Sequence, residues 1–315
     1  MNCGDILQTN IHHDSAFKVW SLPLFIALVA ISFAIWWAPL MSVFALALRD
    51  ESYTHILLIL PISIALIFID WNPMNRNPDG ELREPSFVSN AVVTSVLLIV
   101  AISANAALRW RMLLSPDMQL AANMLALVVW WIAAFFLCFG ARAFRRALFP
   151  LCFLFWMIPL PEFALNSVVS FLQQGSAATA YWFFAAAGIP VAQMGMLIHI
   201  PGLTLEVAPE CSSIRSSLML LVTAMVLAHL LLRSRWRKVL VVAVAVPLSV
   251  AKNGLRIFVL GVLATRVDPS FLIGRLHRQG GILFFLIALA GIFVLLWMLR
   301  RGQDETPGAR ARTPV

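Results

Sequence analysis

Charged side chains are scarce in this sequence. Only 12% of its 315 residues are Asp, Glu, Lys or Arg, whereas 61% are hydrophobic. Soluble domains carry about 25% charged residues, and a soluble protein of this length cannot bury so much apolar surface. The composition therefore excludes a cytosolic enzyme, a disordered chain and a secreted disulfide scaffold. Because the apolar residues form long unbroken runs, it also excludes a β-barrel and predicts an all-α, polytopic bundle of membrane helices.

Cysteine is also rare, with four residues at Cys3, Cys138, Cys152 and Cys211. Their spacing matches neither a zinc-binding pattern nor a Cys-x-x-Cys redox pair. We therefore expect no metal and no cofactor. Cys138 and Cys152 lie among Phe and Leu, as inert membrane-buried thiols do, whereas Cys211 has polar neighbours.

Apolar runs of about 20 residues can cross the hydrocarbon core of a bilayer. The sequence contains seven clear runs of this kind, and we expect one further crossing between Arg146 and Cys211. The prediction is therefore eight spans, in a single domain at residues 18–299. Residues 41–52 are expected to form a loop after the first span. Cytoplasmic tails are expected at residues 1–17 and 300–315, the second of them disordered. The seven runs are residues 18–40, 53–70, 87–108, 118–139, 213–232, 239–263 and 280–299.

The net charge of +8 would suggest a nucleic-acid partner in a soluble protein. In a membrane protein, Lys and Arg gather instead in cytoplasmic loops. With the N-terminus inside and eight spans, 14 of the 23 Lys and Arg residues fall inside and 6 outside. The charge therefore indicates topology and contact with membrane lipid, with no nucleic acid. Residues 161–211 contain no Lys or Arg, and we expect them outside, with one re-entrant or interfacial helix.

Ionisable residues inside membrane spans are costly and are therefore functional candidates. Arg256 lies 18 residues beyond Lys238, or about 27 Å along a helix, which predicts a position near the outer surface. Cys211 begins one span and His277 precedes the last, and both are expected at the same face. The sequence thus predicts a thiol, a guanidinium and an imidazole at one depth.

These three groups suit cysteine chemistry. A cysteine hydrolase needs a thiolate, a proton shuttle and a donor to the oxyanion, roles that fit Cys211, His277 and Arg256 in that order. Ser212 and Ser213 are good N-cap residues, and a thiol at a helix N-terminus loses its proton more readily.

Four further residues are expected to support this site. Arg215 shares a helix face with Cys211, and Asn253 shares one with Arg256. Ser212 and Glu206 flank the nucleophile in sequence.

Less specific explanations stay open from the residues alone. Cys211 can be a small core residue, Arg256 can extend its charge to the interface, and His277 can be a solvated loop residue. Two other classes also remain. Broken helices and intramembrane cations are typical of a transporter or flippase, here for an exopolysaccharide precursor. A structural membrane anchor for a biosynthetic complex would need no thiol.

Several motifs resemble those of the exosortases, a family of membrane-embedded cysteine transpeptidases related to the archaeosortases. Residues 211–216, Cys-Ser-Ser-Ile-Arg-Ser, resemble the signature Cys-Ser-Gly-x-Arg-Ser. Residues 253–257, Asn-Gly-Leu-Arg-Ile, resemble Asn-x-x-Arg-Ile, and His277 precedes the last span as the family histidine does. The chain departs from the family at Ser213 and Ile56, where glycine is usual. Residues 53–55, 155–161 and 188–191 also resemble family motifs upstream of the cysteine.

The resemblance implies a function and a location. Exosortases cleave exported proteins at C-terminal sorting signals, which comprise a Pro-Glu-Pro motif, a transmembrane helix and a basic end, and an acceptor amine or water then releases the product. Cys211 would be the nucleophile, Arg256 would stabilise the thiolate or oxyanion, and His277 would shuttle the proton. The implied location is the bacterial inner membrane, with the active site facing the periplasm and genes for exopolysaccharide production nearby.

Overall fold

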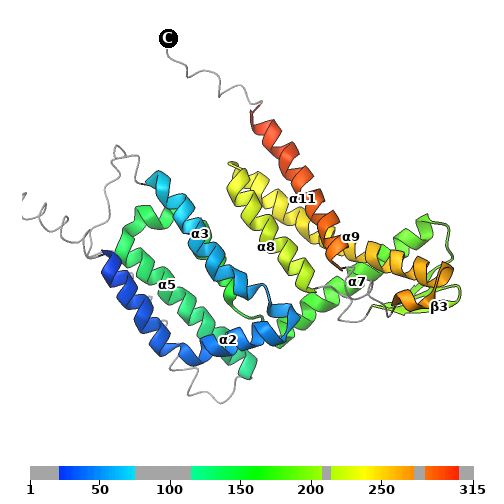
Figure 1. Ribbon diagram of the computed structural model, residues 1–315, viewed down its shortest axis with the longest axis horizontal. Coiled ribbons are helices and arrows are strands. Elements are labelled where there is room, and N and C mark those ends of the chain that lie inside the picture. Colours follow the sequence, from blue (N-terminus) through cyan, green and yellow to red (C-terminus); the bar gives the residue numbers. More distant parts are fainter. Residues whose placement is uncertain (1–20, 75–114, 208–213, 273–280, 305–315) are drawn as a thin grey trace, which may run out of the picture. The chain divides into compact units, whose positions relative to one another are not determined.

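The computed structural model describes residues 21–74, 115–207, 214–272 and 281–304, in two compact units, Met1–Pro161 and Glu162–Val315. Each unit is described by itself. Helices make up nearly all of the described chain, and the strands there form one small sheet in the second unit (Figure 1). This confirms the predicted all-α membrane bundle. The sheet is an addition that the sequence analysis did not predict.

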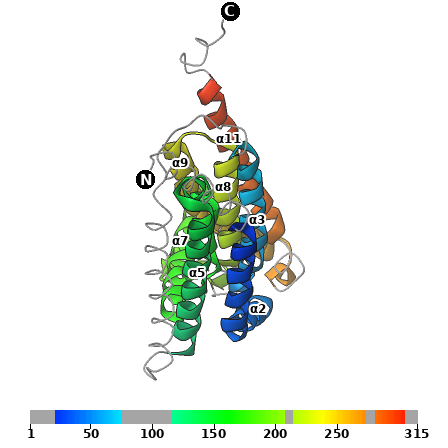
Figure 2. The same cartoon turned by 90° about the vertical axis from the view of Figure 1, so that its left-hand side faces the viewer.

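The first unit is built around the long helix α5. The helix Ser21–Ile35 packs against it (Figure 2), and the indole nitrogens of Trp130 and Trp131 donate hydrogen bonds to Leu28 O (3.0 Å) and Ser32 Oγ (2.8 Å). The labelled elements of this unit are α2 (Trp37–Arg49), η1 (Glu51–Tyr53), α3 (Ile56–Met74), α5 (Pro116–Arg146), α6 (Leu148–Phe153) and η2 (Leu154–Met157).

The first predicted span is broken rather than straight. The chain bends by 75° between Ser21–Ile35 and α2, at the fully buried Trp36. Residues 41–49 are therefore helical, and the prediction of a loop over 41–52 was wrong for most of its length. Apolar content alone cannot locate such a break, because both sides of it are equally hydrophobic.

The second unit is organised around α9, which contacts α7, α8 and α11. In Figure 1, α8 and α9 form a hairpin, and the strands lie at the opposite end of α9 from its turn. Its elements are α7 (Glu162–Ala186), β1 (Ala192–Met194), β2 (Leu197–Ile200), β3 (Leu203–Glu206), α8 (Ile214–Leu231), α9 (Arg235–Arg266), η4 (Pro269–Leu272) and α11 (Gly281–Asp304).

Both α8 and α11 run opposite to α9. Lys238, near the start of α9, donates to His229 O near the end of α8 (3.3 Å). Arg237 donates to Leu299 O (2.7 Å) and Gly302 O (3.0 Å) in the last turns of α11. The first residues of α8 and α11 therefore lie toward the end of the unit where α9 finishes.

The sheet is a compact antiparallel meander in the order β1-β2-β3. Tight turns join the strands at Gly195 (φ 62°) and at Pro201-Gly202 (Gly202 φ 82°), conformations that glycine adopts without steric cost. Ile198 and Ile200 point inward and pack with Phe184 of α7 and residues of α9. The sheet is thus fixed to the end of the helices.

Five helices in the described residues are long and apolar enough to cross a membrane, and counting each of two broken helix pairs as one span raises this to seven. The predicted span 87–108 lies outside the described residues. Large apolar side chains such as Phe68, Trp182 and Ile282 are exposed on these helices, as lipid-facing residues are. The chain is therefore a multi-pass membrane protein.

Candidate functional site

The structure describes only part of the predicted site. Cys211, Ser212 and His277 lie outside the described residues, so their predicted roles stay predictions. Arg256 lies in the C-terminal half of α9 and is half-buried, and Asn253 is one turn before it. The two remaining predicted residues are exposed, Glu206 on β3 and Arg215 in the first turn of α8.

Asn253 joins α9 to α7. Its side chain is 1% exposed, and its Nδ2 donates a hydrogen bond to Ser176 Oγ at 2.9 Å. Ser176 is itself fully buried. A buried amide that lacked its partner would cost about 1–3 kcal/mol, so this contact fixes the relative position of the two helices.

Lys252, the residue before Asn253, joins α9 to α8. Its Nζ donates to Ser216 Oγ at 2.6 Å, and the side chain is 5% exposed. A buried ammonium within a membrane helix is costly, which makes this position a candidate for a functional role. Arg256 follows one turn later, so two cations lie near each other on α9. We call Ser176, Ser216, Lys252, Asn253 and Arg256 the polar cluster.

A second contact of α7 fixes the chain that leads toward Cys211. Gln173 is buried, and its Nε2 donates to Val207 O at 2.8 Å. The N–H of Val207 donates to Met196 O at 3.0 Å, which extends the pairing of β2 and β3. Val207 is thus held on both sides, four residues before Cys211.

The polar cluster depends on a close approach of two helices. A Cβ on Gly254 would lie 2.6 Å from Thr179 Cβ and 3.0 Å from Ala180 N of α7. Farther along, Gly261 of α9 faces Phe184 of α7. The facing residue numbers rise together, so α7 and α9 run in the same direction past each other. Only glycine fits at the point of closest contact.

We therefore expect Gly254→Ala to force α7 and α9 apart. Overpacking of this kind costs about 1–3 kcal/mol, and here the obstacle includes backbone. The variant should unfold at a lower temperature, as measured by thermal unfolding in detergent. The matched control is Gly291→Ala on α11, whose new Cβ would meet Leu248 at an ordinary 3.4 Å. Equal stability of the two variants would contradict the close approach.

In the first unit, two of the upstream motifs meet. Tyr53 Oη donates to Leu160 O at 2.9 Å, and the ring of His55 lies edge-on to Trp156, with 6.3 Å between centroids. His55 is buried. The residues 53–55 and 155–161, which sequence analysis considered separately, therefore form one packed structure.

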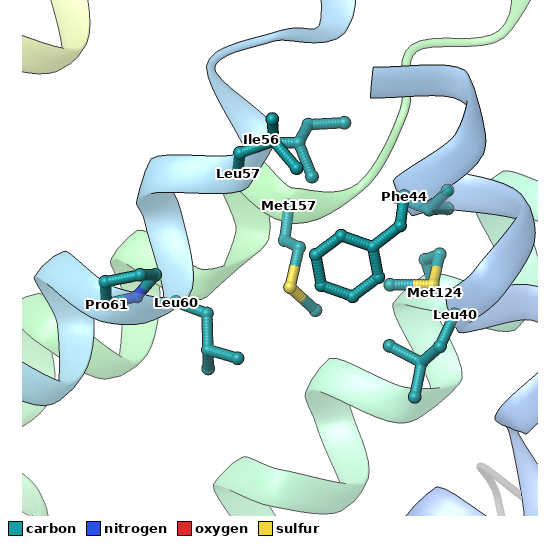
Figure 3. A pocket seen from close by; sticks show the side chains of 9 residues that line it. Leu40, Phe44, Ile56, Leu57, Leu60, Pro61, Met124 and Met157 are labelled. Atoms are coloured by element: carbon teal, nitrogen blue, oxygen red, sulfur yellow. The ribbon is translucent and has the colours of Figure 1, made fainter. Parts of the chain in front are cut away.

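An apolar cavity of about 120 Å³ lies beside the packed residues 53–55 and 155–161 (Figure 3). Ile56, which stands where the family motif has glycine, is one of its lining residues. None of the lining side chains can ionise, so the cavity offers no group for acid–base or nucleophilic chemistry. It is lined by Leu40, Val43, Phe44, Ile56, Leu57, Leu60, Pro61, Met124 and Met157.

Sequence reasoning missed Gln173, Ser176 and Ser216. Gln173 and Ser176 stand at i and i+3 in an otherwise apolar helix, a pattern that places both on one face and was available as a signal. Ser216 is the last residue of the signature at residues 211–216, but the signature does not say which side chain it contacts. Across the described part of the chain, no three His, Cys, Asp or Glu side chains gather as metal ligands would.

Fold and site together define a multi-pass helical membrane protein with buried polar contacts at one end of a helix bundle. The chain belongs to the transmembrane exosortase family, because that family's model, described as Transmembrane exosortase (Exosortase_EpsH), matches residues 36–294. The match includes Cys211, Arg256 and His277. No curated protein and no solved structure matches the chain. The family match confirms the resemblance seen in the sequence motifs. Exosortases are membrane-embedded enzymes of protein sorting.

Proposed function

We propose that this exosortase is a cysteine transpeptidase or protease that cuts exported proteins at the outer face of the bacterial inner membrane. Its substrates would carry a C-terminal sorting signal with a Pro-Glu-Pro motif, an apolar helix and a basic end. The observation that carries the proposal is Arg256, held within one turn of the buried contacts from α9 to α7 and α8.

In the proposed reaction, His277 takes the thiol proton of Cys211, and the thiolate attacks the scissile carbonyl carbon. Arg256 donates hydrogen bonds to the oxyanion that forms. When the C–N bond breaks, His277 returns the proton to the leaving amine, and a thioester remains on Cys211. An acceptor amine or water then attacks the thioester, which releases the product and restores the thiol.

Chain connectivity supports this assignment. Cys211 precedes Ile214, the first residue of α8, by three residues. His277 precedes Gly281, where α11 begins, by four residues. Because α8 and α11 run opposite to α9, Ile214 and Gly281 lie toward the same end of the unit as Arg256.

The proposal is tested with a variant that retains Cys211 as its sole cysteine, made by changing Cys3, Cys138 and Cys152 to alanine. Inner-membrane vesicles turned right side out would contain this variant and a tagged substrate with the sorting signal. We expect one cut beside the motif, and complete loss of cutting when a membrane-impermeant maleimide is added outside.

Two results would count against the proposal. Cutting that continues after Cys211 is fully alkylated would exclude it as the nucleophile. No cutting by a folded protein, with Cys211 labelled from the inside in one state and the outside in another, would favour the transporter alternative. The unmodified chain, assayed in parallel, controls for the three alanine changes.

A further inference from the structure

The free edge of the small sheet has a definite hydrogen-bonding pattern. β3 lies at one edge, and its register with β2 pairs Ile200 with Leu203 across a two-residue turn. In an antiparallel hairpin, such a pair exchanges hydrogen bonds, and the bonded pairs then recur at every second residue. The N–H of Val207 bonds to Met196 O, which agrees with this phase.

Two residues of β3 therefore point their backbone groups away from β2. Leu203 and Leu205 use their N–H and C=O groups toward β2, so those of Thr204 and Glu206 face the open edge. Both residues are exposed, and no hydrogen bond from another described residue reaches these backbone groups. A row of such groups is a template for one more strand.

This edge is held rigidly. Leu205 packs inward, close to Gly261 of α9, and the inward-facing Ile198 and Ile200 pack on the same core. Just beyond the end of β3, the side chain of Gln173 in α7 holds Val207 through a hydrogen bond to its carbonyl oxygen. A strand that pairs with Thr204 and Glu206 would therefore meet groups that are already in place, which lowers the entropic cost of binding.

We infer that the open edge of β3 binds the substrate segment next to the scissile bond as a fourth strand; this inference rests on the proposed function. The alternating groups at Thr204 and Glu206 fit an extended peptide backbone, because such a backbone presents N–H and C=O to one side at every second residue. Cys211 follows Glu206 by five residues, so the edge leads toward the nucleophile.

Recognition through the backbone has a consequence for specificity. Main-chain hydrogen bonds give affinity without selecting side chains, so the edge would accept different sequences beside the cleaved bond. Alternate substrate side chains would lie on the exposed face of the sheet, next to the side chains of Thr204 and Glu206.

Proline variants test the edge in the full-length protein. Thr204→Pro and Glu206→Pro each remove one outward N–H without removing a bond to β2, a change that edge strands tolerate. We expect each to raise KM for the substrate roughly tenfold, with little change in kcat. The matched control is Gln193→Pro, which removes the corresponding outward N–H at the opposite edge, on β1, and should leave KM unchanged.

A second measurement keeps the wild-type protein. Substrates that carry a single N-methyl group, moved one residue at a time along the segment, should lose binding at every second position. Uniform KM values along this series, or unchanged KM in folded Thr204→Pro and Glu206→Pro proteins, would overturn the edge proposal while Cys211-dependent cutting continued. If the wild type does not cut the unmodified substrate, the proposed function itself fails.

Discussion

Changing Cys211 to alanine is expected to abolish processing of a tagged exported substrate, with a loss of at least about a thousandfold. Removal of the nucleophile eliminates the covalent route, and the remaining groups can only assist direct attack by water. Cys211→Ser should be almost as inactive, because a hydroxyl is a much weaker nucleophile than a thiolate near neutral pH. Conversion of precursor to product on gels, followed over time in vesicles, measures both rates.

The matched control for Cys211 is Cys152→Ser. Cys152 is an exposed free thiol on α6 in the first unit, so its loss should leave processing unchanged. Processing by Cys211→Ala at the wild-type rate would contradict the cysteine mechanism. An equal loss of processing in both variants would show that each thiol is needed for the stability of the fold. Thermal unfolding of the two proteins would reveal such a loss of stability.

Changing Arg256 to alanine should lower kcat by about 100- to 1000-fold, the usual cost of removing one donor to an oxyanion. The effect should fall mainly on kcat, because the charge of the oxyanion develops only in the transition state. Arg256→Lys should recover part of the rate, since it keeps the charge but loses the planar donor geometry of the guanidinium.

Arg266→Ala provides the control on the same helix. Arg266 is exposed in the last turn of α9, and its loss should leave kcat unchanged. A variant Arg256→Ala that is folded and raises only KM would assign Arg256 to substrate binding instead of catalysis. Rates should be compared at saturating substrate, with the thermal unfolding temperature of each protein recorded beside them.

The spans of the second unit could be predicted from the sequence because each is a long apolar run closed by basic residues. The predicted runs 213–232, 239–263 and 280–299 correspond to α8, α9 and α11, and each of these helices contains nearly all of its predicted run. The largest differences in length are at the end of α11, which continues five residues beyond its predicted run to Asp304, and at the start of α9, where Arg235–Lys238 belong to the helix. Charge excludes residues from the lipid core but does not end a helix.

The sheet could have been predicted from local signals. Residues 197–206 alternate between inward and outward positions, and Pro201-Gly202 is a typical turn sequence. In a chain that is 61% hydrophobic, this short pattern is weak beside the surrounding apolar runs. The bend at Trp36 gave no local signal, because it depends on packing within the folded unit.

The partners in the site could not be predicted in the same way. Asn253 and Ser176 are 77 positions apart in the chain, and Lys252 and Ser216 are 36 apart. The sequence alone marks Asn253 as a residue expected to support the site, and it places Lys252 beside Asn253 in the same predicted span. It could not say which neighbouring helix would satisfy each of them, since that depends on how tightly α7 and α8 pack on α9.

Arg237 combines two requirements that are usually met by different residues. As one of the cations that the predicted topology places on the inner side, it would help to determine which way the chain inserts, a role in which only the sign of the charge matters. Its guanidinium also bonds two carbonyls in the last turns of α11, 62 and 65 positions away, a role that depends on planar geometry. In that topology, insertion of the chain and packing of its last helix would share one side chain, because the cation that would orient the α8–α9 hairpin also holds the last turns of α11.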